Sequence, residues 1–221
     1  GNVSYAVILF SALSYFVPAF GEGNTLAAIV GASAVLWAVH ALLLVGVREA
    51  AVTNLVTTIA KVAPILMFIA LVAVAFNMQT FNLDFSGLDN PGLGSVMEQV
   101  KGTMLVTLWV FIGIEGASVV SRRASNRKDI DFSTMAGFLV CLVLYAAVSV
   151  ISLGIMPQAE LAALKNPSMA GVLEKVVGPW GAILINLALV VSVLGAFLSW
   201  TLLAAEIPYE AAKDGSMPKF F

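Results

Sequence analysis

One carboxyl group stands in the middle of a long apolar stretch. Glu115 lies within Thr107-Leu-Trp-Val-Phe-Ile-Gly-Ile-Glu-Gly-Ala-Ser118, between Gly113 and Gly116. Each glycine weakens a helix by about 1 kcal/mol relative to alanine, so this pair predicts a break in the helix beside the carboxyl. The ends of a broken helix can hold small polar molecules and ions. The alternative is a neutral glutamate that bonds between helices, with glycines that only permit close packing.

Two tryptophans extend this chemistry. Trp109 lies six residues before Glu115, and Trp200 lies deep in the run Gly195-Ala-Phe-Leu-Ser-Trp-Thr-Leu-Leu-Ala204. An indole face attracts a cation by up to about 2 kcal/mol where water is excluded. Together with the carboxyl, these residues predict a site for a positively charged small molecule. For each tryptophan taken alone, core packing is the alternative.

Three further polar residues lie in apolar surroundings. Lys61 either extends its long stem to an interface or keeps a desolvated ammonium group that acts as a proton-linked switch. His40 has neither a partner carboxylate nor metal-ligand spacing, and we interpret it as structural. Asn2 either contacts a ligand or hydrogen-bonds to a neighbouring helix, and the residue alone does not decide between these roles.

The composition predicts which elements position these residues. Of 221 residues, 60% are hydrophobic and 11% are charged, whereas soluble domains are about 45–50% apolar and about 25% charged. The lipid bilayer is therefore the expected solvent. No basic tract typical of nucleic-acid binding is present, and the single Cys141 excludes a thiolate metal cluster. One carboxyl and one histidine within the spans predict no catalytic residues, no metal and no cofactor.

Six apolar runs predict helices that cross the membrane, each needing about 20 residues. Because backbone groups in lipid must hydrogen-bond internally, we expect an all-α membrane protein. The chain, 1–221, forms one transmembrane region with spans at 1–17, 24–47, 52–76, 102–121, 132–156 and 180–205. Since apolar runs stand at or near both ends, we interpret it as an internal fragment.

Lysine and arginine in the connections predict the orientation. If the spans alternate, three of these residues lie on one side and seven on the other: Arg48, Arg122, Arg123, Arg127, Lys128, Lys213 and Lys219. The richer side is expected to face the cytoplasm. The prediction therefore places the chain end at Phe221 in the cytoplasm.

Several motifs resemble the amino acid–polyamine–organocation superfamily. They are Thr107–Ser118, the basic loop after it, Ser199-Trp-Thr-Leu-Leu-Ala204 and Ala212-Lys-Asp-Gly-Ser-Met-Pro218. Within the superfamily they are most similar to the bacterial basic amino acid antiporters of the arginine/ornithine and arginine/agmatine types. The resemblance implies a twelve-helix, inverted-repeat (LeuT-like) transporter fold, of which this chain holds about helices three to eight.

The resemblance also implies a substrate site. Trp109 is similar to an aromatic gate over the substrate, and the carbonyls of Trp109 and Ile112 are similar to acceptors for its α-ammonium. Trp200 resembles the indole that packs against the guanidinium or amine of the substrate. Asn2 lies where the family has a polar contact to the substrate head.

Coupling and gating are implied for two residues. Glu115 resembles a glutamate of gating and proton sensing, and Lys61 resembles a lysine of proton-coupled relatives. We therefore expect a cationic amino acid antiporter of the bacterial inner membrane, working by alternating access on an amino acid or amine substrate. A homodimer is a candidate assembly. The alternative is a proton-coupled permease for basic or neutral amino acids.

Overall fold

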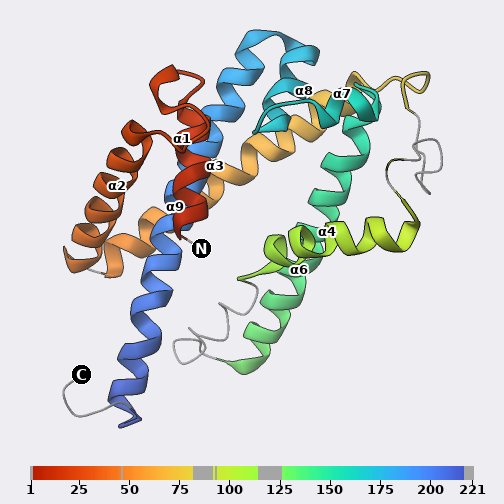
Figure 1. Ribbon diagram of the computed structural model, residues 1–221. Helices are drawn as coiled ribbons and strands as arrows, with labels where there is room; N and C mark the ends of the chain where they lie inside the picture. Colours follow the sequence, from red (N-terminus) through yellow and green to blue (C-terminus); the bar gives the residue numbers. More distant parts are fainter. Residues whose placement is uncertain (1, 46, 82–91, 93, 114–125, 217–221) are drawn as a thin grey trace. The chain divides into compact units, whose positions relative to one another are not determined.

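The computed structural model describes residues 2–45, 47–81, 92, 94–113 and 126–216. Every regular element in these ranges is a helix, so the predicted all-α class is confirmed. In chain order they are α1 (Asn2–Leu13), a 3-10 turn (Pro18–Phe20), α2 (Leu26–Val45), α3 (Val47–Val74), α4 (Val96–Phe111), α6 (Arg127–Ser152), α7 (Gln158–Ala162), α8 (Ser168–Val177) and α9 (Pro179–Lys213) (Figure 1).

Three of these helices are long and apolar enough to cross a membrane. They provide the stretches Leu26–Leu44, Lys128–Ser152 and Pro179–Lys213, and shorter apolar stretches lie at Asn2–Leu13 and Thr58–Val74. The chain divides into two compact units, one formed by Gly1–Phe76 with Ala159–Phe221 and the other by Asn77–Gln158. The first unit holds α1, α2, α3, α8 and α9, and the second holds α4 and α6.

In the first unit, α9 is the helix around which the others pack. It contacts α1, α2, α3 and α8, and 44% of the residues in its most apolar 18-residue segment are buried. Two buried clusters join α1, α2 and α9, one of Leu9, Phe10, Ala28 and Val193, the other of Val39, Phe197 and Leu198. Between lipid-embedded helices such clusters stabilise by close packing, because lipid tails are as apolar as the side chains.

The connection between α1 and α2 folds back tightly onto α1. Gly23 is buried with a φ of 82°, and a Cβ atom at this position would collide with the backbone carbonyl of Val7. Only glycine combines this positive φ with so close an approach of two backbone segments. The turn therefore fixes α2 beside α1, and Ala28 of α2 reaches the cluster formed with Leu9 and Phe10.

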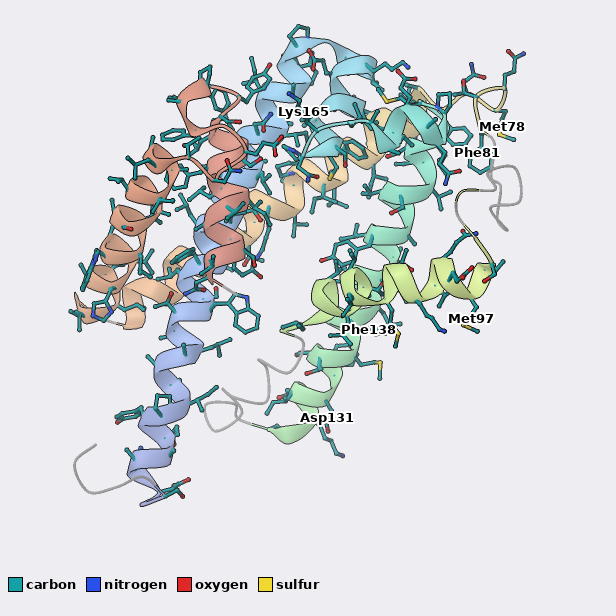
Figure 2. The ribbon with its side chains drawn as sticks, viewed as in Figure 1. Met78, Phe81, Met97, Asp131, Phe138 and Lys165 are labelled. Atoms are coloured by element: carbon teal, nitrogen blue, oxygen red, sulfur yellow. The ribbon has the colours of Figure 1, made fainter. Side chains whose placement is uncertain are left out.

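The second unit is built on aromatic contacts between α4 and α6. The ring of Phe111 lies 5.3 Å from that of Phe138 and 5.9 Å from that of Tyr145, and Figure 2 shows Phe138 where α6 passes α4. Asn126 begins α6 as an N-cap, because its Oδ1 accepts a hydrogen bond from the Lys128 N–H across 3.1 Å. No residue in the most apolar 18-residue segment of α6 is buried.

Candidate functional site

Two side-chain hydrogen bonds join α1 to α9 at one crossing. Nδ2 of Asn2 donates to Oγ1 of Thr201 across 3.2 Å, and Nε1 of Trp200 donates to the hydroxyl of Tyr5 across 3.0 Å. Asn2 and Tyr5 are three residues apart, which places them on one face of α1. The structure thus brings together two residues that the sequence predicts as substrate contacts, Asn2 and Trp200.

The bond from Asn2 is the helix–helix contact that was the alternative to a ligand contact. It uses one of the two hydrogens on Nδ2 and neither lone pair of the side-chain oxygen. The Thr201 hydroxyl in turn donates to the carbonyl of Phe197 across 2.7 Å, so the threonine is also tied to α9. Asn2 is partly exposed, and its geometry fits both a structural role and a polar contact to a ligand.

Tyr5 and Thr201 were not among the predicted site residues. Each is bonded to a residue that was predicted, across 195 and 199 positions of the sequence. A weak local signal was present, because Asn2 and Tyr5 carry polar groups three residues apart in a largely apolar run. Which residues of α9 they contact depends on how the helices pack, and no local sequence pattern predicts it.

The helix that carries Trp109 ends before the predicted glutamate. α4 ends at Phe111, and Gly113 has a φ of 112°, a conformation that favours glycine. The helix therefore ends just before Gly113, while Glu115 and Gly116 lie outside the described residues, so that the interruption of the helix stays a prediction. Trp109 lies in the last turn of α4, though its side chain is also outside the described part, and Ile112 is 48% exposed.

The C-terminal end of α4 has the electrostatic character that an ammonium group requires. The last four carbonyls of an α-helix have no intrahelical donor. Aligned peptide dipoles also place about half a negative charge at this end. Trp109 belongs to that last turn, and the chain leaves the helix through Ile112.

At its other end, α4 begins with a capping box formed by Ser95 and Glu98. Oε2 of Glu98 accepts from the Ser95 N–H across 2.7 Å and from the Ser95 hydroxyl across 2.9 Å, and Oγ of Ser95 accepts from the Glu98 N–H across 3.4 Å. The backbone bond first, and then the hydroxyl bond, lower the pKa of Glu98 below its ordinary value. The carboxylate is thus held in its charged form beside the positive end of the helix.

Lys61 belongs to the first unit and lies on α3. Its side chain is partly buried, and the helix continues through Pro64 to a segment in which Phe68 and Val72 are fully buried. Lys61 therefore shares a unit with Asn2 and Trp200, whereas Trp109 and Ile112 belong to the other. In the described ranges, no group of three or more His, Cys, Asp and Glu side chains is placed to hold a metal ion.

Helices that are long and apolar enough to cross a bilayer are those of a multi-pass membrane protein. Residues 1–221 match the model of a family described as amino acid permease, and the chain belongs to this family. It is 57% identical to the arginine/ornithine antiporter of Pseudomonas aeruginosa over 220 residues, which are 100% of this chain and 46% of the relative.

Other relatives give the same picture. A putative arginine/ornithine antiporter of Escherichia coli K12 is 52% identical over 226 residues, and an arginine/agmatine antiporter of Chlamydia pneumoniae is 48% identical over 226 residues. Each alignment covers 100% of this chain, and 48% and 47% of the respective relatives. The chain therefore spans about half the length of the curated relatives that it matches.

Proposed function

We propose that the protein exchanges cationic amino acids across a membrane, arginine for ornithine, by alternating access. The observation that carries this proposal is the 57% identity to an arginine/ornithine antiporter across the whole chain. At that level of identity, the residues that recognise the substrate are expected to be shared. The relatives are named as transporters, and we propose that the substrate crosses without chemical change.

The substrate is proposed to bind through groups of different kinds. The indole of Trp200 faces the guanidinium or amine by cation–π attraction. The carbonyls of Trp109 and Ile112, at the negative end of α4, accept hydrogen bonds from the α-ammonium, and the Trp109 ring closes over the substrate. Asn2 makes a polar contact to the substrate head. What supports this assignment is the Trp200 bond at the α1–α9 crossing and the end of α4 at Phe111.

Glu115 and Lys61 are proposed to couple binding to gating and to protons. Ionisable side chains within membrane spans commonly mark ion pathways and proton relays. Exchange measured across a pH range in a Glu115→Gln variant tests this role. The profile is expected to change more than the affinity for arginine, and an unchanged profile counts against proton sensing.

We further propose that the protein lies in the bacterial inner membrane with Phe221 on the cytoplasmic side, and that it forms a homodimer. The excess of lysine and arginine in one set of connections supports the orientation. Labelling of single cysteines introduced after Lys213 tests it. These positions should react only with reagents that enter the cell.

The deciding experiment measures counterflow by the full-length protein in proteoliposomes. Radioactive arginine should enter rapidly only when ornithine, arginine, lysine or agmatine is present inside. The uptake rates measured with these four internal substrates rank them as counter-substrates. An exchanger needs substrate on the opposite face, so empty vesicles should show little uptake. Uptake into empty vesicles driven by a pH gradient would overturn exchange and indicate a proton-coupled permease.

A further inference from the structure

The hydroxyl group of Tyr5 lies at the edge of the Trp200 indole. Nε1 of Trp200 donates to this hydroxyl across 3.0 Å, and both side chains are partly buried. The N–H bond of an indole lies in the plane of its rings, so the acceptor holds the ring at its edge. A cation binds over the face of an indole. The bond can therefore orient the ring without occupying the surface that a cation needs.

The ring of Tyr5 is itself held by packing. It packs against both buried clusters of the first unit, the one that contains Leu9 and Val193 and the one that contains Val39 and Phe197. A ring placed between two buried clusters has little rotational freedom, so its hydroxyl is a fixed acceptor. Trp200, in contrast, is carried by α9 beyond the second cluster and is only partly buried.

We propose that Tyr5 is a positioning residue that fixes the Trp200 indole for the cationic end of the substrate. This inference rests on the proposed exchange of cationic amino acids. An indole that is already oriented loses little side-chain freedom when the ligand binds, and this prearrangement raises affinity. Tyr5 thereby acts on recognition of the side-chain cation, through Trp200 and without touching the substrate.

The test compares two substitutions, each of which removes one tyrosine hydroxyl group. Tyr5→Phe removes the hydroxyl and keeps the ring in its packing, while Tyr15→Phe makes the same change at a tyrosine that is 46% exposed after the end of α1. In the full-length protein, Tyr5→Phe should weaken the Kd for arginine about three- to tenfold, the effect of one lost hydrogen bond. Tyr15→Phe should leave the Kd unchanged.

A Trp200→Phe background separates positioning from direct contact. Phenylalanine has no N–H group, so the hydroxyl of Tyr5 has nothing to orient, and adding Tyr5→Phe should cause no further loss of affinity. A further loss in this background would show that Tyr5 acts on the substrate directly and would overturn the positioning role. Equal affinities for Tyr5→Phe and Tyr15→Phe would overturn it as well.

The hydrogen bond has its own spectroscopic signature. With ¹⁵N-labelled indoles, the Trp200 proton resonance is identified by its loss in Trp200→Phe, and it should move upfield in Tyr5→Phe alone. If Tyr5→Phe does not fold, the wild-type resonance decides, because a position typical of a non-bonded indole overturns the inference. If the wild-type protein exchanges no arginine, the proposed function is refuted. If the wild type exchanges arginine normally and Tyr5→Phe leaves the Kd for arginine unchanged, only the role of Tyr5 is refuted.

Discussion

The α1–α9 crossing and the end of α4 contribute different kinds of groups to the proposed substrate site. At the crossing, the side chains proposed to bind the substrate are fixed by hydrogen bonds and by packing against buried clusters. At the end of α4, the proposed contacts are made by the backbone, because the helix ends at Phe111 and Gly113 has a positive φ. Most of the described side chains of α4 are exposed.

The difference determines which kind of substitution alters each region. A side-chain site is altered by replacing the side chain or the neighbour that orients it, and conservative variants isolate single atoms. A backbone site has carbonyls that no substitution removes. It is altered only by changing where the helix ends, and Gly113 is the described residue whose φ requires glycine at that point. Substitutions at the two regions therefore test different parts of the proposed site.

The largest effect is expected from Gly113→Ala, which alters the backbone at the end of α4. A residue with a Cβ atom at a φ of 112° is strained by about 1–3 kcal/mol, or the helix end shifts to relieve the strain. Arginine exchange should fall about 5- to 150-fold. Gly102→Ala is the matched control in the middle of the same helix, where an added Cβ has nothing within 4 Å. Equal exchange by both variants would remove the α4 end from the site.

Trp200→Leu tests the side-chain region. Loss of a desolvated cation–π contact should weaken the binding free energy of arginine by about 1–2 kcal/mol, which raises the Kd about 5- to 30-fold. Trp37→Leu makes the same change at a tryptophan of α2 that is 68% exposed, and it should leave the Kd unchanged. Isothermal titration of the purified protein measures both values. An unaltered Kd in Trp200→Leu would exclude this indole from the substrate site.

The sequence predicted the two regions unequally. Apolar runs and the Gly113–Gly116 pair are local signals, and they were enough to predict an all-helical membrane protein and the helix end before Glu115. The Tyr5–Trp200 and Asn2–Thr201 bonds join positions 195 and 199 residues apart, and no local pattern encodes which helices pack together. Resemblance to the antiporters implied Asn2 and Trp200 but not the residues that hold them.

A double-mutant cycle on Asn2 and Thr201 distinguishes a helix–helix contact at the α1–α9 crossing from a substrate contact. Hydrogen bonds between membrane helices average about 0.6 kcal/mol, so Asn2→Ala and Thr201→Val should show a coupling of this size in stability toward denaturing detergent. Asn2→Ala should also weaken arginine binding, whereas Thr201→Val should not, because only Asn2 is proposed to contact the substrate. If the two single variants bind arginine equally well, Asn2 is a helix–helix contact and nothing more.

The smallest effect concerns the start of α4, which lies away from the proposed ligand groups. The pKa of Glu98 is lowered in the folded protein, so its stabilisation of the first turn is present above the ordinary glutamate pKa. It is lost as the pH falls through the lowered value, when the carboxylate that accepts from Ser95 becomes protonated. The Ser95 amide resonance, followed by NMR from pH 7 downward, should therefore titrate below the ordinary glutamate range.

Glu98→Gln is the control for this titration, since it keeps an acceptor at the same place but cannot ionise. Its Ser95 amide resonance should stay constant over the same pH range, and arginine exchange near neutral pH should match that of the wild type. A wild-type midpoint at or above the ordinary glutamate pKa would contradict the capping box. A loss of exchange in Glu98→Gln would show that the start of α4, and not only its end at Gly113, takes part in transport.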